Sequence, residues 1–240
     1  MPTIGNISVG KSLFLNSMFG NDFCQVNNDI TTKFILFIRH IDNLKEPRLY
    51  ELEPPNTYDF FYSYKDVFTG EENIKNKINQ INDENKNSKK AIFYMLEIEI
   101  KSIENKEFLN NVDFLDIPGL NESEEDYINL YFKYIKDMIK FCLIIFSVEN
   151  FNSEDSMKVI NKLKKNLYVP IENFLIILNK IDISDDLEKT IKDFKNVILN
   201  SGSFNIYKNT LVPVNSLKLK SEIKIKIKSY AFSFTFFFLF

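Results

Sequence analysis

The 240-residue chain is 45% hydrophobic with a net charge of −3, so it can bury a sizeable core and has no overall basic character that would point to nucleic acid. Its two cysteines, Cys24 and Cys142, are too few for a disulfide framework or a metal cluster. No basic-then-apolar leader is visible, and no apolar run approaches the ~20 residues of a membrane span. We therefore expect a cytoplasmic protein of one domain.

The first motif begins at the fifth residue. Residues 5–12 read G-N-I-S-V-G-K-S and match G-x-x-x-x-G-K-[ST], the phosphate-binding loop. Its glycines let the backbone wrap an anion, the lysine reaches the β- and γ-phosphates, and the hydroxyl binds Mg²⁺. The alternative is a chance glycine-rich turn. The nucleotide-binding residues predicted here are Gly5, Asn6, Ile7, Ser8, Val9, Gly10, Lys11, Ser12 and Leu13.

The segment before this loop is short. A buried strand normally leads into a phosphate-binding loop, and here only residues 1–4 precede it. We therefore expect a first strand that is largely missing and a domain that is truncated at its N-terminus. Because this strand lies in mid-sheet, its loss would expose pairing edges on both of its neighbours.

A polar loop at 27–32 follows the first predicted helix, and a β-rich run follows at 33–39. A threonine before this second strand can place its hydroxyl on Mg²⁺ and its backbone N–H on the γ-phosphate. We choose Thr32 over Thr31 because Thr32 directly precedes the basic residue and the strand. A plain loop threonine is the alternative.

The next segments carry weaker patterns. Residues 42–66 contain three prolines and are predicted to be irregular, and 70–86 has the apolar spacing of a helix. Residues 91–103 alternate apolar and charged side chains, which predicts a long strand with one exposed face at or near a sheet edge.

The second motif ends the apolar run that starts at Val112. In Asp116-Ile117-Pro118-Gly119 the carboxylate can hold an Mg²⁺ ligand water, and the glycine offers a backbone N–H to the γ-phosphate. The alternative is a strand followed by a Pro-Gly turn. An amphipathic helix is predicted at 122–140.

The third motif follows two continuous apolar strands, 141–148 and 174–178, with a helix at 153–167 that Ser153 could cap. It reads Asn179-Lys180-Ile181-Asp182. The carboxylate of Asp182 can accept two hydrogen bonds from guanine N1 and N2, a donor pair that adenine lacks. Asn179 would brace the loops, and the stem of Lys180 would lie over the base.

The remaining predicted elements are a helix at 185–200 and a strand at 212–216. The exit loop of that strand places Asn215 and Ser216 where backbone contacts to the base are expected, although an ordinary strand end is the alternative. The element order is that of an α/β protein with a doubly wound, mostly parallel sheet, and every predicted contact lies at a strand's carboxyl end.

This ordered set of motifs resembles the G domain of a P-loop GTPase. Asp116 lies 104 positions after Ser12, much farther than in small Ras-like GTPases. With the strand around Leu96–Ile100, this spacing resembles the dynamin superfamily of large GTPases over residues 3 to about 216. The resemblance implies GTP and GDP as ligands, Mg²⁺ as cofactor through Ser12, Thr32 and Asp116, and catalytic roles for Lys11, Ser8 and Thr32.

The sequence departs from this family at two positions. Dynamins usually have a glutamine at the position of Ile7, and Ras-like enzymes have one at the position of Leu120. Neither side chain here can orient a water by a hydrogen bond. We therefore expect slow hydrolysis, and a nucleotide-binding switch module or a degenerate fragment with little turnover is the alternative.

Residues 217–240 form a lysine- and phenylalanine-rich tail beyond the predicted G domain of residues 1–216. The tail is either a membrane-surface element or a β-prone, aggregation-liable segment, and we favour the second interpretation. A homodimer across the nucleotide face and a peripheral membrane contact are the partners considered. His40, the only histidine, is interpreted as structural or surface.

Overall fold

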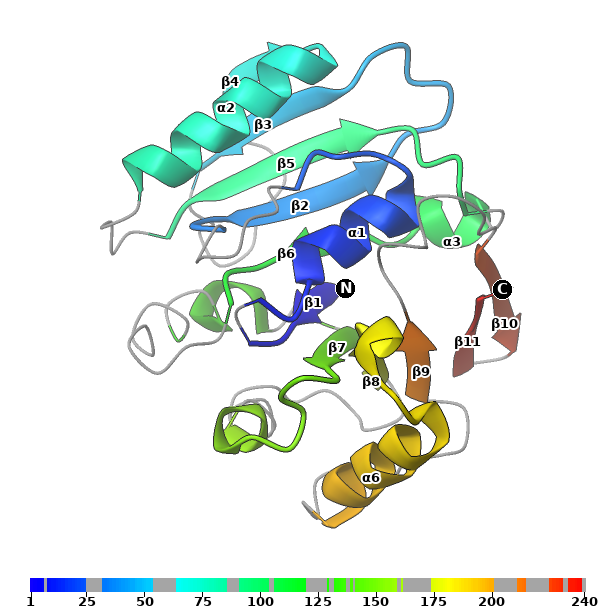
Figure 1. Ribbon diagram of the computed structural model, residues 1–240. Helices are drawn as coiled ribbons and strands as arrows, with labels where there is room; N and C mark the ends of the chain where they lie inside the picture. The colour runs from blue at the N-terminus through cyan, green and yellow to red at the C-terminus, as the bar shows by residue number, and fades with distance from the viewer. Residues whose placement is uncertain are drawn as a thin grey trace.

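The computed structural model describes residues 1–6, 8–24, 32–53, 64–85, 91–103, 106–119, 129, 132–136, 139, 141–158, 161, 174–200, 211–214, 225–230 and 233–238. Figure 1 shows the arrangement. The elements are β1 Pro2–Ile4, α1 Lys11–Phe19, β2 Ile35–His40, β3 Arg48–Leu52, β4 Tyr64–Thr69, α2 Glu71–Glu84, β5 Phe93–Ile98, α3 Lys106–Asn110, β6 Phe114–Asp116, β7 Cys142–Ser147, β8 Phe174–Asn179, the 3₁₀ helix η4 Ile181–Ile183, α6 Leu187–Asn200, β9 Leu211–Val214, β10 Ile225–Tyr230 and β11 Ser233–Phe238.

One nine-stranded sheet runs through the described residues in the order β4-β3-β5-β2-β6-β1-β7-β8-β9. Strands β6, β1, β7, β8 and β9 are mutually parallel, whereas β2 is antiparallel to β6 and β3 is antiparallel to both of its neighbours. The predicted doubly wound, mostly parallel α/β sheet is confirmed. The carboxyl ends of the parallel strands share one edge of the sheet, where ligands bind in such folds.

Alternation along the strands sorts the core into two layers. Leu36 and Ile38 of β2 pack with α1 and α2 on one face, whereas Ile35 and Phe37 pack on the other face, in the cluster that contains Phe194 of α6. Successive side chains of a strand point to opposite faces, so a strand that is apolar throughout is buried on both. Figure 1 shows α2 lying across β3 and β4.

The first strand is short but present. Residues Pro2–Ile4 form β1, all three are buried, and they pair with β6 on one side and β7 on the other. The backbone N–H of Leu115 also donates to the carbonyl of Met1 at 3.0 Å. The expectation that both neighbours expose free edges here is therefore wrong, because even three residues supply ladder bonds to each side.

Two predictions in the middle of the chain are wrong. Residues 42–66 are not irregular throughout, because they contain β3 and the start of β4. The long exposed strand at 91–103 is only Phe93–Ile98, lies third from the sheet edge, and is buried on both faces apart from a half-buried Glu97. Tyr50 donates a hydrogen bond to Glu97 at 2.9 Å, which satisfies this carboxylate inside the sheet.

The later helices and the tail are partly described. Ser153 caps a helix as predicted, because its Oγ accepts a hydrogen bond from the Ser156 N–H at 3.2 Å. In the tail, β10 and β11 pair as an antiparallel hairpin outside the main sheet. No helix among the described residues is long and apolar enough to cross a membrane.

Candidate nucleotide-binding site

The phosphate-binding loop leaves β1 and packs on β7 and β8. A Cβ on Gly5 would lie 2.4 Å from the carbonyl oxygen of Ile145, and one on Gly10 would lie 2.5 Å from Nδ2 of Asn179. Gly10 also has φ +88°, a left-handed conformation that side chains disfavour. Both motif glycines are therefore required by contact with the strands beneath them, and α1 begins directly after the second.

The loop exposes one motif side chain and buries the next. Ser8 is exposed and has φ 61°, whereas Val9 is 1% exposed and belongs to the core. Ser8 thus lies on the solvent side of the loop, where the predicted contact to a transferring phosphoryl group would be made. Ile7 lies outside the described residues, as do Thr31, Leu120, Asn215 and Ser216.

Lys11, in the first turn of α1, turns back onto its own loop. Its Nζ donates to the carbonyl oxygens of Asn6 at 2.9 Å and Gly5 at 3.2 Å, and the residue is buried. Burial lowers the pKa of Lys11 to about 8, an effect that the Asp116 carboxylate opposes. Within the part of the chain that the structure describes, the hydrogen bonds of the ammonium go to backbone carbonyls and not to a carboxylate, so the charge is available to a bound phosphate group.

Three predicted metal-binding residues converge from α1, the loop before β2, and β6. Ser12 Oγ donates to Asp116 Oδ2 at 2.9 Å, and Thr32 Oγ1 lies 3.4 Å from the same oxygen and 3.5 Å from Ser12 Oγ. All three residues are buried, Asp116 to 1% exposure. The three residues that the sequence names as metal ligands therefore lie within hydrogen-bonding reach of one another, and their binding of Mg²⁺ stays a prediction.

The second carboxylate oxygen of Asp116 indicates whether these residues could bind a cation. Asp116 Oδ1 is buried and has no hydrogen-bond partner among the described residues, and burial raises the pKa of this carboxyl group against the opposing effect of Lys11. An orphaned buried oxygen is costly unless a ligand completes it. Hydroxyl and carboxylate oxygens are the ligands that Mg²⁺ prefers, directly or through water, so the residues fit this ion.

Several residues that support the Ser12, Thr32 and Asp116 cluster lie outside the three sequence motifs. The backbone N–H of Lys33, next to Thr32, donates to Asn82 Oδ1 of α2 at 2.9 Å. Asn16 of α1 bonds both backbone groups of Cys24, at 2.7 and 2.9 Å. Burial and then the neighbouring Asp116 carboxylate raise the pKa of the Cys24 thiol, which stays protonated at neutral pH. Only the tertiary fold reveals these partners, because local patterns carry no signal for them.

The third motif closes the other side of the loop. Asn179, at the end of β8, is 1% exposed and donates through Nδ2 to the Val9 carbonyl at 3.0 Å, so the predicted bracing of the loops is confirmed. Lys180 follows with φ 60°, and its Nζ pairs with Glu149, whose pKa this contact lowers. Asp182 is exposed in η4, which follows the carboxyl end of β8.

The structure also shows the surroundings of Gly119 and His40, two residues discussed in the sequence analysis. Gly119 is buried three positions after Asp116. His40 is 2% exposed; its Nδ1 accepts from the Ile100 N–H at 2.9 Å, and its Nε2 lies 2.9 Å from Asp42. The accepting Nδ1 places the ring proton on Nε2. The structural interpretation of His40 is confirmed.

Comparison with known proteins decides the family. A family model described as "Dynamin family" matches residues 3–181. The chain belongs to the dynamin family. The resemblance drawn from the motifs is thereby confirmed, and residues 3–181 form a dynamin-type G domain, the domain of a family of GTPases.

A solved structure supports the fold of this dynamin-family chain. It comes from work titled "An oligomerised bacterial dynamin pair provides a mechanism for the long range sensing and tethering of membranes", with 17% identity and a TM-score of 0.57. The match covers 91% of this chain and 33% of the other, so the present chain spans about a third of that dynamin's length. No curated protein matches.

Proposed function

We propose that this G domain binds GTP together with Mg²⁺ and hydrolyses it slowly to GDP. The observation that carries the proposal is the convergence of Ser12, Thr32 and Asp116 beside the buried ammonium of Lys11, where one oxygen of the Asp116 carboxylate has no hydrogen-bond partner among the described residues. Oxygen ligands next to a buried cation suit a metal-bound triphosphate.

Each residue has a role that follows from its place. Lys11 would exchange its two loop carbonyls for β- and γ-phosphate oxygens and stabilise charge that develops during transfer. Ser12, Thr32 and Asp116 would hold Mg²⁺, which would neutralise negative charge on the bound phosphates. Gly119 and the backbone of Thr32 would contact the γ-phosphate, and Ser8 would contact the transferring group. Asn179, Lys180 and Asp182 would hold the guanine base.

Slow turnover is proposed from the residues at the two water-orienting positions. Ile7 and Leu120 are apolar where related GTPases carry a glutamine amide. Positioning and charge stabilisation by Lys11 and Thr32 would remain and support a basal rate. The same pair of residues favours the second candidate, a switch module that binds GTP and scarcely turns it over.

The solved relative's title speaks of an oligomerised pair and of membrane tethering. On this basis we propose that the domain pairs across its nucleotide face and works in the cytoplasm at a membrane surface.

The deciding test of GTP binding uses the purified chain with Mg²⁺ or EDTA and with ATP as competitor. Selective, Mg²⁺-dependent binding that Asp116→Asn weakens about tenfold or more supports it.

A matched pair of variants sharpens this test. Asp113→Asn changes a carboxylate three positions earlier, one that pairs with Arg39 outside the site, and should leave the Mg²⁺ dependence unchanged. Equal binding of ATP and GTP by a folded chain would refute the proposal.

Ile7→Gln separates the slow enzyme from the switch module. The variant supplies an amide that can orient water, so steady-state phosphate release should rise if the site is otherwise competent. Ile7→Leu is the matched control and should leave the rate unchanged. A glutamine variant that binds GTP normally and stays as slow as the original chain would favour the switch module.

A further inference from the structure

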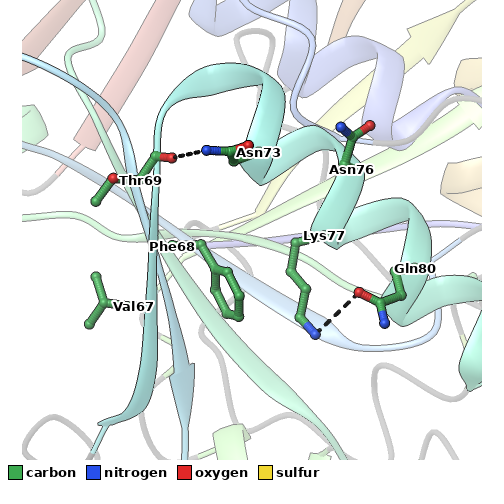
Figure 2. Close-up of a pocket in the computed structure, with 7 residues that line it drawn as sticks. All are labelled: Val67, Phe68, Thr69, Asn73, Asn76, Lys77 and Gln80. Carbon is green, nitrogen blue, oxygen red and sulfur yellow. Dashed lines mark hydrogen bonds between the residues drawn. The ribbon is translucent and has the colours of Figure 1, made fainter.

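The outer edge of the sheet carries a groove between β4 and α2. Figure 2 shows this groove, which has a volume of about 430 Å³. β4 is the last strand of the sheet, and among the described residues no strand pairs with its outer edge. An edge strand keeps backbone N–H and C=O groups with which another strand can pair. The residues lining the groove are Val67, Phe68, Thr69, Asn73, Asn76, Lys77 and Gln80.

The two faces of this edge differ in chemistry. Pairing with β3 puts Phe68 opposite Leu49, in the core layer under α2, and Val67 opposite Tyr50, on the other face. Figure 2 shows Phe68 between the strand and the helix, with Val67 on the far side of the strand. Val67 is 53% exposed and Tyr64 is 51% exposed, and the Tyr64 ring lies 4.9 Å from that of Tyr50. An apolar face and a helix-flanked polar groove thus share one edge.

The polar groove offers donors and a cation. Asn73, Asn76, Lys77 and Gln80 follow the three- and four-residue spacing of one side of a helix. Lys77 Nζ lies 5.1 Å from the centre of the Phe68 ring and 3.5 Å from Gln80 Oε1. Among the described residues that line the groove, Lys77 alone is charged, and its ammonium can pair with a carboxylate.

We propose that this edge docks an extended peptide strand of a partner protein, with acidic side chains at alternate positions. The strand would extend the sheet at β4, which supplies backbone hydrogen bonds. Its side chains alternate between faces, so its carboxylates meet Lys77 while the intervening apolar side chains cover Val67 and Tyr64. None of these residues belongs to the nucleotide site, and the proposal is independent of GTP turnover.

The test uses the full chain and a labelled peptide of about eight residues that alternates glutamate and valine, measured by fluorescence anisotropy. The peptide should bind the original chain, and Lys77→Glu should raise its Kd about tenfold or more. The same variant should instead bind the peptide with lysine in place of glutamate, which also shows that it is folded. Lys75→Glu is on the same helix but outside the groove lining and should leave binding unchanged.

Backbone pairing is tested with two peptides that are N-methylated at alternate residues. Each peptide therefore lacks the N–H donors along one of its two edges. An added strand uses one edge only, so one of the two peptides should lose binding and the other should keep it. The proposal is overturned if the wild-type chain does not bind the glutamate peptide, if Lys77→Glu binds it equally well, or if both methylated peptides behave alike. Self-association of the chain that is seen by sedimentation and abolished by Lys77→Glu would also overturn it, because a second copy would then occupy this edge.

Discussion

At the residue scale, Lys11 determines how the site responds to pH. Its ammonium is buried and bonded to two carbonyl oxygens, and its pKa is about 8 instead of the usual 10.5. In the unliganded protein it therefore releases its proton within the range of ordinary buffers. A bound triphosphate would favour the charged form, because an opposite charge at close range raises the pKa of an ammonium group.

We predict that GTP affinity falls as the pH rises above about 8. Above that value Lys11 must take up a proton when the triphosphate binds, which costs up to about tenfold in affinity for each pH unit. Isothermal titration between about pH 7.5 and 9 measures this slope and the accompanying proton uptake. Lys11→Met should bind weakly at every pH and lack the slope. Equal slopes in the two proteins would contradict the assignment.

We also predict that Asp182→Asn relaxes the preference for guanine. The amide replaces one of two acceptors for guanine N1 and N2 by a donor, so selectivity over other purines should fall by about 1–3 kcal/mol. Competition binding with GTP, ITP and XTP measures the change. Asp185→Asn, three positions later and also exposed, is the matched control. Selectivity that stays unchanged in Asp182→Asn would refute our assignment of the base contact.

At the element scale, α2 does more than cover the sheet. Three isoleucines on one side, Ile74, Ile78 and Ile81, bury it against the core, and Asn82 reaches the backbone beside Thr32. Helical spacing predicted the apolar side of α2 from sequence. The hydrogen bond to Lys33 spans 49 positions, and a periodic pattern contains no information about a partner so far away.

We predict that Asn82→Leu lowers the free energy of unfolding by about 1–3 kcal/mol, because it leaves the Lys33 N–H buried without its acceptor. It should also weaken Mg²⁺-dependent GTP binding, since Thr32 loses the anchor of its neighbouring peptide. Asn82→Asp keeps an oxygen that can accept this hydrogen bond. Its free energy of unfolding and its GTP affinity should therefore be closer to those of the original chain. Urea unfolding and nucleotide titration give the two readouts, and normal GTP binding by Asn82→Leu would show that Thr32 is positioned by other contacts.

At the scale of the whole molecule, the sheet joins two core layers. Phe194 of α6 is fully buried, with its ring 5.4 Å from that of Phe146 and 5.3 Å from that of Phe151. This cluster lies on the face opposite α1 and α2, whereas the phosphate-binding loop packs against the carboxyl ends of β7 and β8. Ile117 of the second motif belongs to this cluster and Ile181 of the third motif packs against it, so the second layer supports the site from beneath.

We predict that Phe194→Ala lowers the free energy of unfolding by about 3–5 kcal/mol, from lost burial and the cavity that remains. The folded fraction should keep its guanine selectivity, because the aromatic partners of Phe194 are Phe146 and Phe151, to which we assign no nucleotide contact. Leu187→Ala on the same helix, 37% exposed, should change stability little. Urea unfolding compares the three proteins. A loss of selectivity in folded Phe194→Ala would show that the second layer shapes the base site directly.

The sequence by itself determined the motif chemistry, the family resemblance and the doubly wound fold class. Phosphate and base contacts need particular residue types at short, regular spacings, and buried parallel strands are continuous apolar runs. Tertiary structure alone decided that residues 48–52 pair between β4 and β5, and that Glu97 lies inside the sheet with Tyr50 as its partner. It also decided that Asn82 anchors the backbone beside Thr32. These outcomes depend on hydrogen-bond partners that are distant in the chain, and such partners are selected only when the whole sheet assembles.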